Sequence, residues 1–235
     1  MLRDRLGRMA RRAASLIEGR REPGRVPGAD RAFAAFHDAA EGAVAMVGAA
    51  LVSTWEIGLT DVGRALAGKI PDDRRAALVE RLSDGLVPVQ QPINAAGHRL
   101  RAAAQQAARQ SLAGATPEAA AAGLSKALSP LAAETQTGWE RSTDWLADLF
   151  QVYADPPAVR ARFAAVGGEV ARVLSVAAVS FSRALDEAAT GTELEAGLLA
   201  ALEAWRAEAC AGLERVVYTA RTALVEAPLR AGEAP

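Results

Sequence analysis

Apolar residues recur every three or four positions along most of the chain, and the pattern is clearest between residues 157 and 226. Steps of three and four place such residues on one side of an α-helix. The region divides into two stripes of this kind, which predicts two long helices. The first stripe is Val159, Phe163, Val166, Val170, Val173, Ala177, Phe181, Leu185 and Ala188, and the second is Leu194, Leu198, Leu202, Trp205, Ala209, Leu213, Val216, Ala220 and Leu224.

A short break separates the two stripes at Thr190-Gly191-Thr192. Thr192 and Glu195 have the spacing of a capping box, which would start the second helix. Helices joined by so short a connection are antiparallel neighbours. The sequence therefore predicts a C-terminal hairpin over residues 157–226, with two helices of roughly 33 residues and about 50 Å each.

The most apolar window runs from Gly42 to Thr60, where Glu56 is the only charged residue. A helix that is apolar all round is either buried or spans a membrane, and this one is just long enough to span. The glycines of the window and the cost of charging Glu56 in lipid favour a buried central helix, with insertion as the alternative. Small residues on one face would let another helix approach closely, and bulkier residues lie on the other side. The small face is Ala35, Ala39, Gly42, Met46, Ala49 and Ser53, and the other side carries Val44, Val47 and Leu51.

Helix boundaries elsewhere follow from caps and prolines. Asp30 is a suitable N-cap, and Thr116-Pro117 and Ser129-Pro130 each place an N-cap before a proline. A helix opening at Pro71 is expected to stop at Gly85. Two prolines bracket the next residues, 86–92, which predicts an extended connector and a domain boundary. A helix over 93–112 follows.

These boundaries predict four segments. They are a basic arm and linker (1–28), an apolar helical segment (29–87), a helical bundle (88–228) and a tail (229–235), with one domain spanning 29–228 as the alternative. Only 5% of the chain is aromatic, β-branched runs are rare and alanine, the best helix former, is abundant. The predicted fold class is therefore all-α, an elongated bundle of six to eight helices.

Charge is distributed unevenly between the N-terminus and the rest of the chain. Residues 1–31 carry a net charge of +5, and the remainder carries −6. Residues 2–19 have the pattern of an amphipathic helix with a basic face, which suits an anionic membrane surface or a protein partner; a solvated terminal helix is the alternative. The expected contact residues are Leu2, Arg3, Arg5, Leu6, Arg8, Met9, Arg11, Arg12, Leu16 and Ile17.

Other partners and destinations follow from the same region. Nucleic acid is not expected as a partner, because the arm has no aromatic residue to stack on a base and the body is acidic. A secretory signal is not expected either, because no apolar core follows the arginines. We expect a cytoplasmic protein, with peripheral membrane attachment as a further option.

Motifs for catalysis, metals and cofactors are incomplete. Gly63 to Lys69 matches part of a phosphate-binding loop, but Ile70 and Pro71 replace the required hydroxyl and one amide. His37, with Glu41 one turn on, lacks the further ligands of a metal site. Cys210 is the only cysteine, which excludes an intramolecular disulfide. We therefore expect no cofactor and no metal, and a protein that acts without catalysis, with an enzyme whose site these motifs do not reveal as the open alternative.

Two hypotheses for function remain. The first is a non-enzymatic scaffold, coat or assembly subunit that acts through helix surfaces, with a protein partner or self-association. The second is a module that binds a lipid-like or aromatic ligand between helices bearing Trp55, Trp139, Trp145 and Trp205. Such tryptophans are most often core residues, and otherwise mark an interface or a ligand pocket.

Overall fold

A computed structural model describes residues 27–226 and the side chains of residues 27–222. The described part contains six helices and no β-strand, which confirms the all-α fold class. The helices are α2 (Ala29–Ala65), α3 (Asp72–Leu112), α4 (Pro117–Leu128), α5 (Leu131–Phe150), α6 (Pro156–Thr190) and α7 (Leu194–Glu226). The N-terminal arm lies outside the described residues.

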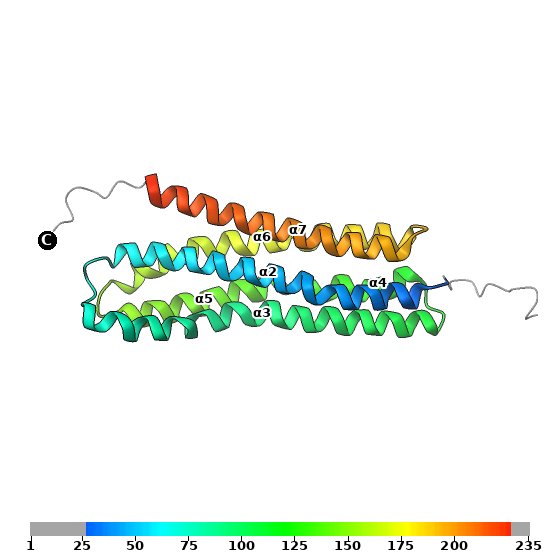
Figure 1. Ribbon diagram of the computed structural model, residues 1–235, viewed down its shortest axis with the longest axis horizontal. Helices are drawn as coiled ribbons and strands as arrows, with labels where there is room; N and C mark the ends of the chain where they lie inside the picture. Colours follow the sequence, from blue (N-terminus) through cyan, green and yellow to red (C-terminus); the bar gives the residue numbers. More distant parts are fainter. Residues whose placement is uncertain (1–26, 227–235) are drawn as a thin grey trace, which may run out of the picture.

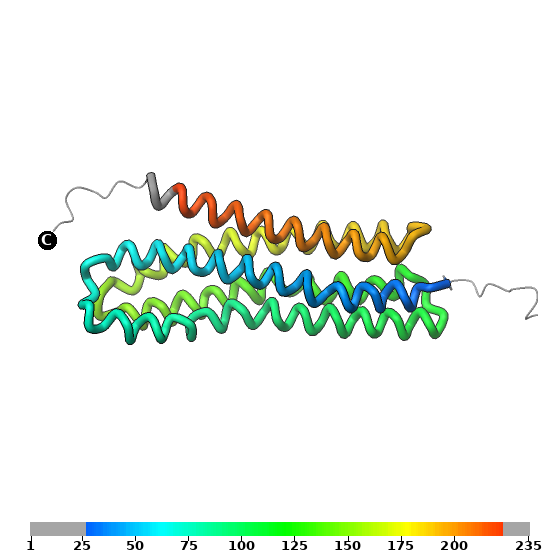
Figure 2. The backbone as a smooth tube through the Cα atoms, viewed as in Figure 1, coloured from blue at the N-terminus to red at the C-terminus, as the bar shows by residue number. Residues whose placement is uncertain are grey.

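The helices run alternately along one long axis, and α4 and α5 lie end to end as one rod (Figure 1). The bundle therefore has four antiparallel rods, which are α2, α3, the pair α4–α5, and α6. Helix α7 packs against both α2 and α6. The described chain begins and ends at opposite ends of the bundle (Figure 2). One continuous core runs through it and includes residues on both sides of position 88, such as Val62 and Val89.

The C-terminal hairpin joins α6 to α7 through residues 191–193, and two glycines set its spacing. A Cβ on Gly197 would lie 2.8 Å from the Ala188 Cβ, and one on Gly212 would overlap Val173. These two contacts lie fifteen residues apart on each helix, in opposite directions. They fix an antiparallel register in which the residue numbers of facing positions add to the same value.

The prediction that residues 86–92 form an extended connector is wrong. Helix α3 is continuous and contains Pro88 and Pro92 in its interior. Proline at 92 cannot donate an amide to the Pro88 carbonyl one turn earlier, which weakens the helix locally. Helix α5 packs at that point, because Gly138 has no side chain and any Cβ there would overlap the Pro88 carbonyl oxygen. Burial of Val89 and Ile93 in the core then offsets the local cost of the prolines.

The predicted helix stop at Gly85 is wrong for a related reason. Gly85 is buried within α3, and a Cβ there would lie 2.6 Å from Cε3 of Trp145 on α5. The missing side chain of Gly85 therefore makes room for the indole ring, and the glycine does not end the helix. Helix α3 consequently runs for 41 residues and spans both predicted segments.

Helix starts agree in part with the predicted caps. Thr116 accepts a hydrogen bond from the Ala119 amide at 3.4 Å, so the Thr116-Pro117 start is confirmed. Gly28, not Asp30, is the N-cap of α2, and Asp30 lies in its first turn. Ser129 is not an N-cap either, because its hydroxyl donates to the Lys126 carbonyl and α5 begins after Pro130.

The break between α4 and α5 is held by one arginine of α3. Arg99 donates from Nε to the Ala127 carbonyl at 3.1 Å, near the end of α4. Its two terminal nitrogens bind both oxygens of Glu134, in the first turn of α5, at 3.1 and 2.8 Å. A two-pronged arginine–carboxylate pair is specific in geometry. Arg99 therefore fixes the two short helices as one rod.

Candidate functional site: the face formed by α6 and α7

The four tryptophans are distributed between the core and its edge. Trp55, Trp139 and Trp205 are buried, and Trp145 is partly buried against the core. None of them lines the hollows that lie between α6 and α7, between α3 and α5, or beside the first turns of α2 and α7. In this structure three of the tryptophans pack inside the bundle, and Trp145 packs against the edge of its core.

Trp139 shows how the glycines of the chain create that packing. A Cβ on Gly167 would lie 2.6 Å from Cγ of the Trp139 indole, and the indole Nε1 donates to the Phe163 carbonyl at 2.9 Å. The ring stacks on Phe163 with 5.0 Å between ring centres. Of the two glycines in α6, Gly167 is therefore a contact site, whereas Gly168 has nothing within 4 Å of an added Cβ. Close packing, not a hinge, explains Gly167.

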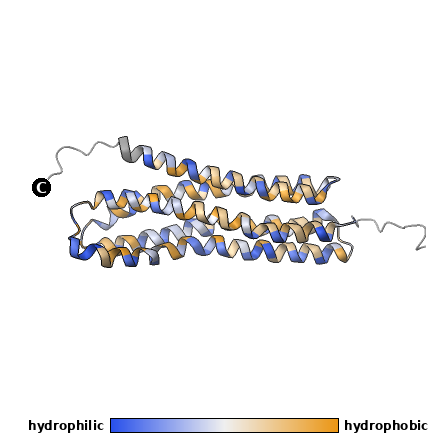
Figure 3. Cartoon of the chain, viewed as in Figure 1, coloured by the Kyte–Doolittle hydropathy of each residue, from blue (hydrophilic) through white to orange (hydrophobic). Residues whose placement is uncertain are grey.

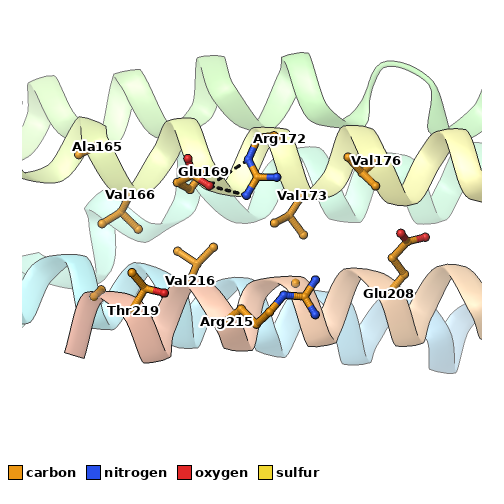
Figure 4. A pocket seen from close by; sticks show the side chains of 12 residues that line it. Ala165, Val166, Glu169, Arg172, Val173, Val176, Glu208, Arg215, Val216 and Thr219 are labelled. Carbon is orange, nitrogen blue, oxygen red and sulfur yellow. Dashed lines mark hydrogen bonds and ion pairs between the residues drawn. The ribbon is translucent and has the colours of Figure 1, made fainter. Parts of the chain in front are cut away.

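An open groove of about 490 Å³ lies between α6 and the second half of α7. Val166 and Val173 project from α6 and Val216 projects from α7 into the space between the helices (Figure 4). The close contact of Gly212 with Val173 closes one end of the floor. The groove is thus apolar inside and wide enough for side chains or an alkyl chain.

Charged residues of both signs line the rim of the groove. On α6, Glu169 accepts two hydrogen bonds from Arg172, at 3.0 Å from Nε and 2.6 Å from Nη2 (Figure 4). On α7, Glu208 and Arg215 have no ion-pair partner within the described part of the chain. The rim therefore offers one internally paired set of charges and one set that is free to meet a partner.

The apolar stripe of α7 continues beyond the part of the bundle that covers it. Leu213 is fully buried, but Val216 and Ala220 are only half-buried, although they continue the same stripe. Tyr218 has 73% of its surface exposed. The second half of α7 extends away from the other helices towards the C-terminal end (Figure 1). This end of the helix has more apolar surface than the fold uses.

A second set of positions, spaced by three and four, points outward from both helices. We call this set the α6–α7 face, and all of its members are exposed or half-buried. Its alternation of three and four residues is the repeat with which helices pair along a seam. The set consists of Ala165, Glu169, Arg172, Val176 and Val179 on α6, and Ala204, Glu208, Ala211, Arg215 and Tyr218 on α7.

Helix α2 has an uncovered face too. The small-residue face that was expected to receive another helix points outward: Ala39, Gly42, Met46, Ala49 and Ser53 are exposed, and Ala35 is half-buried. Val47 and Leu51, on the opposite side, are buried in the core. From α7, Arg206 donates to the Met46 sulfur at 3.1 Å and pairs with Glu203, which partly closes the edge of this face. Hydrophobic and hydrophilic residues alternate along α2 and α7 (Figure 3).

The remaining candidates for chemistry form surface contacts. His37 lies 3.0 Å from Asp38 Oδ1 and 3.0 Å from the Gln105 amide nitrogen, while Glu41 pairs with Arg101 at 3.2 Å. Among the described residues no group of three or more histidine, cysteine, aspartate or glutamate side chains could hold a metal ion.

The surroundings of the partial phosphate-loop motif and of the cysteine do not favour phosphate binding or nucleophilic catalysis. Residues 63–69 form the end of α2 and the following turn, where helix carbonyls rather than amides are free. Cys210 is half-buried, and burial raises the pKa of its thiol. A raised pKa disfavours the nucleophilic thiolate.

Two helices of the described chain, α2 and α6, are long and apolar enough to cross a membrane. In their most apolar windows, both of mean hydropathy 1.5, 44% and 33% of the residues are buried within the bundle. Both helices therefore contribute to the core and also expose apolar surface. The predicted contact residues at positions 2–17 lie outside the described residues.

Comparison with protein families, curated proteins and solved structures finds no match for this chain. Any functional conclusion therefore rests on the geometry above. Sequence reasoning missed the groove between α6 and α7 and the two charges on its rim, Glu208 and Arg215. The signal that would have found them is the second set of positions at heptad spacing, which lies beside the core stripes of the two helices.

Proposed function

We propose that this protein is a non-enzymatic scaffold, coat or assembly subunit that acts by attaching its helix surfaces to other apolar or helical surfaces. The observation that carries the proposal is the excess of apolar surface on long helices: more than half of the most apolar windows of α2 and α6 is not buried. Contiguous apolar surface on a folded protein commonly marks an interaction site.

The N-terminal arm supplies a second contact in this proposal. Its apolar stripe and arginines suit an anionic membrane surface, to which a basic amphipathic helix binds in the plane of the interface. The body of the chain, with a net charge of −6 beyond residue 31, would be held away from the same surface. We therefore propose peripheral attachment of a cytoplasmic protein, with the bundle presented to other proteins.

A ligand-binding module has less support. The two tryptophans of α5 pack against α3 at Gly85 and against α6 at Gly167, and no tryptophan lines the hollows described above. The α6–α7 groove has the volume of a small-molecule site, but it is open along its length. An alkyl ligand there would remain partly in water, whereas a helix or a flat apolar surface would cover the groove.

Liposome flotation of the full chain tests the membrane contact. We expect the chain to float with anionic vesicles, to stay down with neutral ones, and to be released by salt. The Leu6→Asp, Met9→Asp double variant should lose flotation, because each buried apolar side chain is worth about 2 kcal/mol and two correspond to about a thousandfold in affinity. The matched control is Gly7→Asp with Ala14→Asp, which adds the same charge off the apolar stripe and should still float.

Two results would contradict peripheral attachment through the arm. Flotation that persists in high salt and in both variants would mean that α2 or α6 inserts into the bilayer. Equal loss of flotation in the control variant would mean that net charge alone, without the apolar stripe, governs binding.

A further inference from the structure

We propose that the α6–α7 face binds the same face of a second copy of this chain, antiparallel, about a two-fold axis that crosses α7 between Ala211 and Gly212. The inference rests on the proposed function, since it names the partner of one of the helix surfaces. Two hairpins packed face to face in this way would form a four-helix interface, the usual solution for helices that share an apolar face.

The apolar part of the face has the spacing that such an interface needs. Val176 and Val179 on α6 are 48% and 61% exposed, and Tyr218 on α7 is 73% exposed. On α7 the small side chains of Ala204 and Ala211 leave room for a helix to approach closely. An antiparallel partner would place its Tyr218 near the level of Val179 and cover the valine-lined groove.

The charges of α7 select a second copy over other occupants. Glu208 and Arg215 have no partner among the described residues, carry opposite signs and lie seven residues apart on the exposed side of one helix. A two-fold axis midway between them places Glu208 of each copy opposite Arg215 of the other. The dimer then contains two Glu208–Arg215 ion pairs, one on each side of the axis. Such charge complementarity fixes the register between helices.

The dimensions of the face set the size of the contact. Ala204 to Tyr218 spans about 21 Å at 1.5 Å per residue, and two neighbouring helices are about 20 Å wide. The product is about 420 Å² per partner, roughly half of the 800 Å² of a standard interface, so the paired charges must supply much of the specificity. A lipid surface could cover the valines, but it offers no fixed charges of both signs at the spacing of Glu208 and Arg215.

A charge-reversal experiment on the full chain tests the two-fold axis. Sedimentation equilibrium of the unchanged chain should give twice its monomer mass of 24.4 kDa. Glu208→Arg alone, or Arg215→Glu alone, creates two repulsive pairs per dimer and should weaken dimerisation at least tenfold. The combined Glu208→Arg, Arg215→Glu variant should restore it. Mixing the two single variants should produce a heterodimer, because one then carries only positive and the other only negative charge at these positions.

A pair of valine variants tests the apolar contact. Val176→Asp with Val179→Asp should abolish the dimer. The matched control is Val79→Asp with Val87→Asp on α3, where the two valines are 65% and 48% exposed and lie away from α6 and α7. The control should dimerise as the unchanged chain does, and circular dichroism checks that all variants keep their helix content.

Each outcome decides the inference. Rescue by the combined charge variant, together with loss of the dimer only in the α6 valine variant, supports it. A monomeric chain at all concentrations, a dimer indifferent to Glu208→Arg, or equal loss in the α3 control overturns it. A monomer that still floats with anionic liposomes refutes the second copy as partner and leaves the proposed function standing, whereas a monomer that does not float refutes both the second copy and the membrane contact of the arm.

Discussion

Replacing Gly167 by alanine tests the packing that positions α5 against α6. A Cβ at this position would overlap the Trp139 indole, which is completely buried and cannot withdraw without breaking its 2.9 Å hydrogen bond to the Phe163 carbonyl. Overpacking of a core costs about 1–3 kcal/mol, and leaving the indole N–H unpaired costs about 1–3 kcal/mol more. Alanine returns about 1 kcal/mol of helix propensity. The expected net loss is about 1–5 kcal/mol.

The neighbouring glycine is a matched control for the same chemical change. An alanine at Gly168 would meet nothing within 4 Å, so only the propensity gain remains, and the variant should be more stable by about 0.5–1 kcal/mol. Thermal unfolding followed by circular dichroism resolves the difference. For a domain of this size 1 kcal/mol shifts Tm by about 2–4 °C. The predicted change is a fall of about 2–20 °C for Gly167→Ala and a rise of about 1–4 °C for Gly168→Ala.

The same experiment has an optical readout. Near-ultraviolet circular dichroism of the tryptophans should change in Gly167→Ala and not in Gly168→Ala, because only the first displaces Trp139. If both variants were stabilised equally, the close contact of Gly167 with the indole would be refuted. A destabilised Gly168→Ala would instead show that this turn of α6 is not an unobstructed helix.

Three further predictions concern other contacts of the bundle. Gly138→Ala should lower the free energy of unfolding by more than about 2 kcal/mol in chemical denaturation, because its Cβ would overlap a backbone carbonyl of α3 that cannot rotate away. In the control Gly123→Ala, the added Cβ makes only an ordinary 3.9 Å contact, and the free energy of unfolding should rise by up to about 1 kcal/mol. Ser142→Ala should cost about 1–3 kcal/mol by removing the acceptor of the Trp55 indole at 2.9 Å, and combination with Trp55→Phe should cost less than the sum of the two single changes. Burial raises the pKa of Cys210, so iodoacetamide should alkylate the folded chain more slowly than the unfolded chain at mildly alkaline pH. Equal alkylation rates would contradict the burial. The stability that this thiol contributes should be lost as pH rises through its folded pKa.

Periodicity was sufficient to predict most helices, because long apolar stripes leave little choice of partner. The ranges of α6 and α7 follow directly from their stripes, and the Thr116 cap was visible as a threonine before proline. The predicted helix stop at Gly85 and the predicted connector at the prolines of α3 were wrong. Local rules treat these residues as helix breakers, but here tertiary contacts with Trp145 and Gly138 decide the outcome.

The uncovered faces were harder to predict for a different reason. In α2 both sides of the helix are apolar, and the sequence does not say which one the core will cover. The side with Val47 and Leu51 buries more area per residue, so the small side with Gly42 and Ala49 is left outside. Glu208 and Arg215 likewise resemble ordinary solvated charges in the sequence, and only the structure shows that both line the groove between α6 and α7.

Hydrogen exchange of the full chain, with and without anionic liposomes, tests most directly the claim that this protein works by attaching its surfaces. Attachment through the arm predicts that liposomes slow exchange in peptides covering residues 2–17, leave the core of α3 and α5 unchanged, and do not alter exchange in α2. New protection across residues 42–60, or loss of protection in the core, would show that the bundle opens to enter the bilayer. Unchanged exchange at every peptide in the presence of vesicles would contradict membrane attachment altogether.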